Sequence, residues 1–207
     1  MQAARAQPEA VVFDLGNVLI HWDRRLLYAS LFSDPAELEH FLEEVYTLEA
    51  NERLDRGESL ADFCASLAAE HPGYAAEILT LADRWIETMG PAIDGTVEIL
   101  RELRADGVAC FALSNWNADT YAMVEDIHEF LGWFDGVVLS GREGITKPDP
   151  EIYRRLLEHH ALDAESVFFV DDSPVNVDAA RRLGMDAELF TGADDLRLAL
   201  QARGLLR

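Results

Sequence analysis

Short apolar runs that give way abruptly to polar or turn residues recur along the chain. The first run begins at Ala10 and gives way to Asp14 and Gly16. Runs of this length, bounded by turn residues, are typical of strands buried in a parallel sheet. We therefore predict strands at residues 10–15, 108–113, 137–139, 167–170 and 187–190.

Helical patterns separate these strands in the second half of the chain. Three of them begin with residues that favour helix N-termini, at Asn117, at Asp149 before a proline, and at Ser173 before another proline. The alternation of strands and helices predicts an α/β fold with a Rossmann-like, doubly wound parallel sheet.

Residues 22–90 lack the strand pattern and keep only helical periodicity. We predict that they form an all-helical cap domain, inserted over the carboxyl end of the first strand. Residues 1–21 and 91–207 would form the α/β core domain. The two chain crossings between the domains, at residues 18–22 and 90–91, are candidate hinges.

The composition is that of a globular protein with an acidic surface. The 207 residues are 49% hydrophobic and their mean hydropathy is -0.05. The formal net charge is -22, and a field of that sign repels nucleic acid and anionic membranes. We expect neither as a partner, and we expect any phosphate site to contain local positive charge.

Cysteine usage and the absence of targeting patterns favour a cytoplasmic location. Cys64 and Cys110 are the only cysteines, and neither belongs to a cluster with the spacing of a zinc site. The first ten residues lack the apolar centre of a signal peptide, and no run reaches the roughly 20 apolar residues of a membrane span. For the oligomeric state, the sequence is compatible with a monomer and with a homodimer.

Polar residues follow the predicted strands. In an open α/β sheet, ligands bind beyond the carboxyl ends of the strands. The polar residues at these positions are Asp14, Ser114, Asn115, Lys147, Asp171 and Asp172. Each alone is more often a turn or capping residue, but their shared position at one edge of the sheet predicts an active site.

This set of side chains suits phosphoryl transfer through an aspartyl-phosphate. Asp14 is the candidate nucleophile. Because a carboxylate and a phosphate repel each other, we expect Mg²⁺ to be held by Asp14 and Asp172, with Lys147 as a second positive group. The expected phosphate-binding groups are the Lys147 ammonium, the Ser114 hydroxyl and the main-chain amides near Gly16 and Asn115.

Other residues near these motifs allow more than one interpretation. Trp22 and Trp116 stand close to the motifs, where core packing and a place in the substrate pocket are both open. Arg24 and Arg25 begin the insertion, and a solvated helix face is favoured there over contact with an anionic substrate.

The polar residues lie in four ordered motifs that resemble those of the haloacid dehalogenase superfamily, at residues 14–18 (DLGNV), 113–115 (LSN), 147–150 (KPDP) and 171–176 (DDSPVN). The resemblance implies that Asp14 attacks the phosphorus of a small phosphorylated substrate. It also implies Mg²⁺ held by Asp14, Asp172 and the Gly16 carbonyl, with Asp171 and Asn176 supporting these ligands. Residues 22–90 would then be a four-helix cap.

The second position after the nucleophile departs from the family pattern. Most phosphatases of the family carry an aspartate there as general acid and base, whereas this chain has Gly16. Loss of such a group typically costs about 10²–10⁴ in rate. The glycine version resembles the branch that includes bacterial α-D-glucose-1-phosphate phosphatase. We hypothesise that a sugar phosphate, whose anomeric oxygen leaves readily, or water-assisted proton transfer compensates for the glycine.

Two other functions fit parts of the same pattern. A 2-haloacid dehalogenase also uses an aspartate nucleophile without the second aspartate, but it needs no metal, so the pair Asp171 and Asp172 favours the phosphatase. A non-catalytic phosphate-binding module would gain nothing from a carboxylate such as Asp14 facing a phosphate. Phosphate release that depends on Mg²⁺ would distinguish the phosphatase from both.

Overall fold

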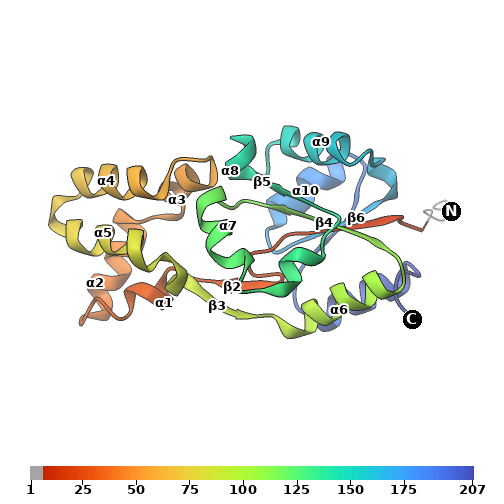
Figure 1. Cartoon of the computed structure of the whole chain (residues 1–207), viewed down its shortest axis with the longest axis horizontal. Helices are drawn as coiled ribbons and strands as arrows, with labels where there is room; N and C mark the ends of the chain where they lie inside the picture. The colour runs from red at the N-terminus through yellow and green to blue at the C-terminus, as the bar shows by residue number, and fades with distance from the viewer. Residues whose placement is uncertain (1–6) are drawn as a thin grey trace.

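Within residues 7–207, which the computed structural model describes, five strands form one parallel sheet (Figure 1). Residues 1–6 lie outside the described part of the chain. The predicted core domain begins in them, and they belong to the first ten residues, in which no signal peptide was predicted. The predicted strands are confirmed as β1 (Ala10–Phe13), β4 (Ala109–Ser114), β5 (Gly136–Leu139), β6 (Val167–Asp171) and β7 (Asp186–Leu189). Their order is β5-β4-β1-β6-β7, and all neighbours run parallel.

Helices cover both faces of this sheet. They are α6 (Asp94–Ala105), α7 (Ala118–Glu125), α8 (Ser140–Glu143), α9 (Pro150–His159), α10 (Pro174–Arg182) and α11 (Ala193–Ala202), with 3₁₀ turns at Glu129–Trp133 and Ala164–Ser166. Successive residues of a strand point to opposite faces. Val11 and Phe13 therefore pack with α6 and α11, whereas Ala10 and Val12 pack with α9 and α10. The doubly wound α/β fold is confirmed.

Capping residues begin the three helices where the sequence predicted them. The side chains of Asn117 and Asp149 accept main-chain N–H groups in the first turns of α7 and α9. Ser173 stands at the start of α10 without such a bond, and its own N–H donates to Asp171 Oδ1 at 2.8 Å. The start of α10 is thereby tied to the end of β6.

A helical unit lies beyond the carboxyl ends of the central strands (Figure 1). It contains α1 (Arg25–Tyr28), α2 (Pro35–His40), α3 (Leu48–Asp55), α4 (Leu60–Glu70) and α5 (Ala75–Arg84), a π-helical turn at Phe41–Val45, and 3₁₀ turns at Pro72–Tyr74 and Trp85–Thr88. Because α1 is a single turn, the longer helices of this unit are α2 to α5. Among the described residues, no helix is both long and apolar enough to cross a membrane.

The two crossings between the helical unit and the sheet pair as an antiparallel ribbon of β2 (Ile20–Trp22) and β3 (Met89–Ala92). The pattern of residues 22–90 did not reveal this ribbon, because strands of three or four residues are too short for a clear alternation. Trp22 pairs with Met89, and Ile20 pairs with Ala92. The candidate hinge segments are therefore joined by main-chain pairing.

The environment of Arg24 corrects one expectation. Arg24 is buried in the helical unit, where its guanidinium donates to the main-chain oxygens of Leu42 and Tyr46. A solvated position is therefore wrong for Arg24, because the end of the π-helical turn presents buried carbonyl groups that need donors. Arg25 is exposed, as expected, and pairs with Glu39.

Candidate active site

Asp14 lies just beyond the end of the central strand β1. Its N–H donates to the Val170 carbonyl oxygen on β6 at 2.9 Å, and its Oδ1 accepts the N–H of Leu15 at 2.7 Å. The residue is only 7% exposed. A carboxylate with so little access to water requires compensating charge.

Lys147 supplies part of that charge. Its Nζ lies 2.9 Å from Asp14 Oδ1 and 2.7 Å from Asp171 Oδ2, and it donates to the Leu113 carbonyl oxygen at 2.8 Å. The Asn115 side chain holds the loop of Lys147, since it donates to the Lys147 carbonyl at 2.9 Å and accepts the Lys147 N–H at 2.7 Å. The acceptor and one donor of the Asn115 side chain are thus used, and its main-chain amide stays the group expected to bind a phosphate.

Asp171 and Asn176 lie together behind Lys147. Asp171 is fully buried, and its Oδ1 accepts hydrogen bonds from Asn176 Nδ2 at 2.9 Å and from the Ser173 N–H at 2.8 Å. Its other oxygen, Oδ2, accepts a hydrogen bond from Lys147 Nζ. The structure brings these residues together as the resemblance implied, and their support of a metal ion stays a prediction.

The carboxylates of Asp14, Asp171 and Asp172 converge at the edge of the sheet. One oxygen of each lies within 4.8 Å of the others, and Asp172 is exposed at the rim. Hard divalent cations take oxygen ligands, and Mg²⁺ binds through one or two carboxylates together with water and phosphate oxygens. Three carboxylates against the ammonium of Lys147 leave two negative charges among these four groups. The donor set therefore fits a divalent cation.

The ionisation of this cluster points to the same need for a cation. Burial raises the pKa of Asp14 to about 7, with Lys147 opposing the shift and Asp171 adding to it. Although Asp172 is exposed on one side, its partial loss of solvent also raises its pKa, again with Asp171 adding and Lys147 opposing. Burial alone would lower the pKa of Lys147, but Asp14 and Asp171 raise it. A bound cation would favour the ionised carboxylates.

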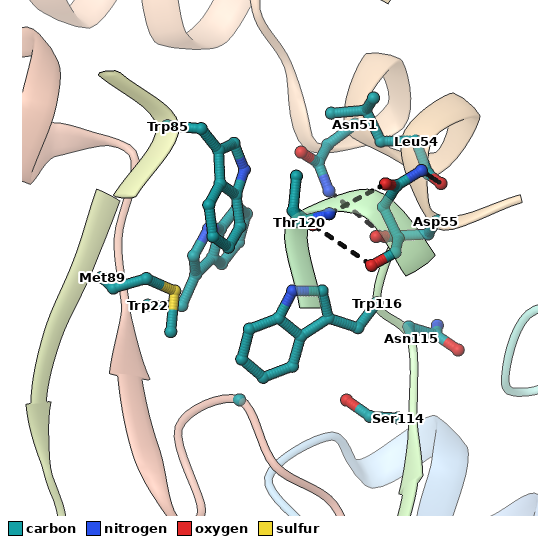
Figure 2. Close-up of a pocket in the computed structure, with 12 residues that line it drawn as sticks. Trp22, Asn51, Leu54, Asp55, Trp85, Met89, Ser114, Asn115, Trp116 and Thr120 are labelled. Atoms are coloured by element: carbon teal, nitrogen blue, oxygen red, sulfur yellow. Dashed lines mark hydrogen bonds between the residues drawn. The ribbon is translucent and has the colours of Figure 1, made fainter. Parts of the chain in front are cut away.

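An open pocket begins at the strand ends (Figure 2). Gly16, Ser114 and Asn115 line it on the side of the sheet. Its apolar lining consists of Trp22, Leu54, Trp85, Met89 and Trp116. Both Trp22 and Trp116, whose roles the sequence left open, therefore face this space. Apolar and aromatic faces with a few polar groups are typical of a small-ligand pocket.

Asn51 and Asp55 of α3 add polar groups to this pocket, opposite Trp22 and Met89 in Figure 2. The Tyr46 hydroxyl donates to Asn51 Oδ1 at 2.8 Å, and Asn51 Nδ2 donates to Asp55 Oδ2 at 3.2 Å. Among the described residues that line the pocket, Asp55 is the only carboxylate. Asp55 was not predicted from the sequence, because an aspartate two residues before a glycine is typical of an ordinary exposed helix end.

Gly16 leaves open space beside the nucleophile. A Cβ built at this position would have no heavy atom within 4 Å, so packing does not require the glycine. The next residue, Asn17, has a left-handed φ of 55°. Its side chain accepts the N–H of Trp22 at 3.1 Å and hydrogen-bonds Asp172, which opposes the rise in the Asp172 pKa. This second contact was not predicted from the sequence.

The geometry of the strand ends agrees with a comparison against protein families. The family described as haloacid dehalogenase-like hydrolase matches residues 8–184. The chain belongs to this family. The superfamily that the four motifs suggested is confirmed, and the chain is a haloacid dehalogenase-like hydrolase.

Relatives of this haloacid dehalogenase-like hydrolase include named phosphate-ester hydrolases. The sesquiterpene phosphatase astK of Aspergillus oryzae is 29% identical over 199 residues, which cover 96% of each chain. Flavin mononucleotide hydrolase 1 of Arabidopsis thaliana is 32% identical over 116 residues, 55% of this chain and 46% of the relative. A haloacid dehalogenase family enzyme of Bacteroides thetaiotaomicron, solved with magnesium and inorganic phosphate, has a TM-score of 0.72 at 23% identity and covers 89% of this chain and 95% of its own. This last likeness shows the fold.

Proposed function

We propose that this hydrolase is a Mg²⁺-dependent phosphatase that cleaves small phosphate monoesters through an aspartyl-phosphate on Asp14. The observation that carries the proposal is the environment of Asp14, whose carboxylate contacts the ammonium of Lys147 and lies close to the carboxylates of Asp171 and Asp172. The two relatives named for phosphate-ester hydrolysis support the same reaction.

The reaction divides into two displacements at phosphorus. Asp14 attacks first, and the bond between phosphorus and the leaving alcohol breaks. Asp14, Asp172 and the Gly16 carbonyl would hold Mg²⁺, which would supply the charge that lets an anionic nucleophile approach a phosphate. The Ser114 hydroxyl and the main-chain amides near Gly16 and Asn115 donate to the phosphate oxygens. Water then attacks phosphorus, which releases phosphate and regenerates Asp14.

The leaving group of the substrate occupies the pocket beside the strand ends. The indole faces of Trp22, Trp85 and Trp116 suit a leaving group with flat or apolar surfaces. A sugar 1-phosphate presents such faces on its ring, and its anomeric oxygen leaves readily, so it stays the first candidate. A sesquiterpene phosphate and flavin mononucleotide match the names of the two relatives and complete the panel.

Release of inorganic phosphate from p-nitrophenyl phosphate and from this panel tests the proposal. Release should require Mg²⁺, stop with a chelator, and fall to background in Asp14→Asn, which keeps the size of the side chain. The control is Asp178→Asn, which neutralises an exposed carboxylate on α10 and should retain full activity. Wild-type protein that releases no phosphate from any of these substrates in Mg²⁺ would overturn the proposal.

The site of water attack distinguishes the phosphatase from a dehalogenase. In a single turnover in H₂¹⁸O, attack at phosphorus places ¹⁸O in the released phosphate and none in Asp14. A dehalogenase forms a carbon ester on its aspartate, and hydrolysis at the carbonyl places ¹⁸O in that side chain. Chloride release from 2-chloropropionate without metal would favour the dehalogenase.

A further inference from the structure

A turn of the helical unit is fixed against the core at the edge of the pocket. This docking turn runs from Leu54 to Glu58. Asn117 Nδ2 donates to the carbonyl oxygens of Leu54 and Glu58 at 2.9 and 2.8 Å. Ser140 Oγ donates to the Asp55 carbonyl oxygen at 2.5 Å. Core side chains thus hold the main chain on both sides of the Asp55 side chain.

The main chain of the docking turn also packs directly against the main chain of the core. Gly57 has a φ of +99°, and a Cβ there would lie 2.6 Å from the Gly141 carbonyl oxygen. A Cβ on Gly141 would lie 2.9 Å from the Trp116 carbonyl oxygen and 2.8 Å from the Ala118 nitrogen. Only glycine fits at both positions without movement of the main chain. The position of Asp55 relative to the end of β4 is therefore well defined.

A chain of hydrogen bonds orients the Asp55 side chain. Arg24 donates to the Tyr46 carbonyl oxygen, and the Tyr46 hydroxyl donates to Asn51 Oδ1. Asn51 Nδ2 in turn donates to Asp55 Oδ2 at 3.2 Å. This bond occupies one carboxyl oxygen and leaves Oδ1 as the atom that can carry a proton.

The charges around Asp55 suit a group that changes its protonation near neutral pH. Burial raises its pKa to about 7, and the hydrogen bond from Asn51 opposes the shift. The negative charges of Glu52 and Asp14 add to the rise, and Lys147 opposes it. A general acid and base works best when its pKa lies near the operating pH.

We propose that Asp55 is the catalytic general acid and base of this enzyme, in the role for which Gly16 has no side chain. The inference rests on the phosphatase reaction proposed above. In the first step, Asp14 bonds to phosphorus, the bond to the leaving oxygen breaks, and that oxygen takes the proton of the Asp55 carboxyl. In the second step, the Asp55 carboxylate takes a proton from the water that attacks phosphorus, and the bond from Asp14 to phosphorus breaks.

The dependence on the leaving group tests this role in the full chain with Mg²⁺. p-Nitrophenolate leaves without a proton, whereas the alkoxide of 2-phenylethyl phosphate needs one. In single turnovers, Asp55→Asn should keep the rate of nitrophenolate release within about 3-fold, and should lose about 10²–10⁴ in the release of 2-phenylethanol. Equal losses with both substrates, or no loss with either, would overturn the inference.

A second variant controls for charge and folding. Glu49→Gln removes an exposed carboxylate in the first turn of the same helix, α3, and it should leave both release rates unchanged. The rise in Tm on Mg²⁺ binding should be the same in Asp55→Asn as in wild type, because Asp55 is not among the proposed metal ligands. Failure of the phosphatase proposal looks different, since wild-type protein would then release neither alcohol.

Discussion

Gly16 leaves space that a side chain at this position could fill. A Cβ there would have no heavy atom within 4 Å, and Gly16 lines the same pocket as Asp55. Both positions therefore border the space in which a leaving oxygen would lie. In this interpretation one proton donor is enough, and the helical unit supplies it in place of the strand end.

A carboxyl group restored at position 16 should replace a missing one at position 55. In an Asp55→Asn background, Gly16→Asp should raise kcat for 2-phenylethyl phosphate at least about 10-fold, because a proton donor again borders the leaving oxygen. In the wild-type background the same change should raise kcat less than about 3-fold. Steady-state phosphate release measures both.

The matched control is Gly16→Asn in the Asp55→Asn background, which adds similar volume without a proton to give, and should not raise kcat. If Gly16→Asp gave the same gain in both backgrounds, the wild-type enzyme would have no donor at Asp55.

Some residues near the strand ends could be predicted from the sequence and others could not, depending on whether the neighbouring sequence determines their position. The proximity of Asp14, Asp171 and Asp172 could be predicted, because they stand at the ends of apolar runs and parallel strands bring their carboxyl ends to one edge. Asp55 could not, because its place in the pocket depends on how the helical unit folds against the core. No pattern within a single helix encodes that contact.

At the scale of elements, the strands and helices of the core followed from periodicity and capping residues. The β2–β3 ribbon did not, because its two strands lie far apart in the chain and Met89–Ala92 contains glycine and proline. The burial of Arg24 was missed for a similar reason, since its acceptors are carbonyl groups of a π-helical turn. Pairing between distant short segments is a tertiary property.

Contact between the docking turn and the core should be needed for catalysis. Gly57→Ala places a Cβ 2.6 Å from the Gly141 carbonyl oxygen at a left-handed φ, so the turn must move away. Because the movement displaces Asp55, we expect kcat/KM for 2-phenylethyl phosphate to fall about 10-fold or more. Enzyme kinetics and thermal unfolding of the same samples measure the effect.

Gly107→Ala separates this effect from backbone strain. Gly107 also has a left-handed φ, +79°, but a Cβ there would have no heavy atom within 4 Å. Both variants should lose about 1–2 kcal/mol of unfolding free energy from the left-handed residue, and only Gly57→Ala should lose activity. Similar kinetics in the two variants would show that the contact has no catalytic role.

At the scale of the whole molecule, the site must bind an anion in a strongly acidic protein. The net charge of -22 repels phosphate esters over distances up to the screening length. Added monovalent salt should therefore lower KM for a phosphate ester while it weakens this repulsion. The local balance at the site, with Lys147 and a divalent cation against three carboxylates, matters more than the overall field, because these groups are partly removed from solvent.

The same carboxylates should link stability to pH and to Mg²⁺. Burial raises the pKa of Asp14 from 3.8 to about 7, so between these values the folded protein binds more protons than the unfolded chain. The stabilisation is complete below about pH 4 and is lost as pH rises through about 7, so the metal-free protein should become less stable over this range. Mg²⁺ binds the ionised form, and its gain in Tm should be larger near pH 8 than near pH 5. Thermal unfolding with chelator or excess Mg²⁺ measures both trends.

Asp14→Asn should lose most of the gain in Tm on Mg²⁺ binding, while Asp178→Asn should keep it. A gain in Tm that does not depend on pH would contradict a cation site built on Asp14.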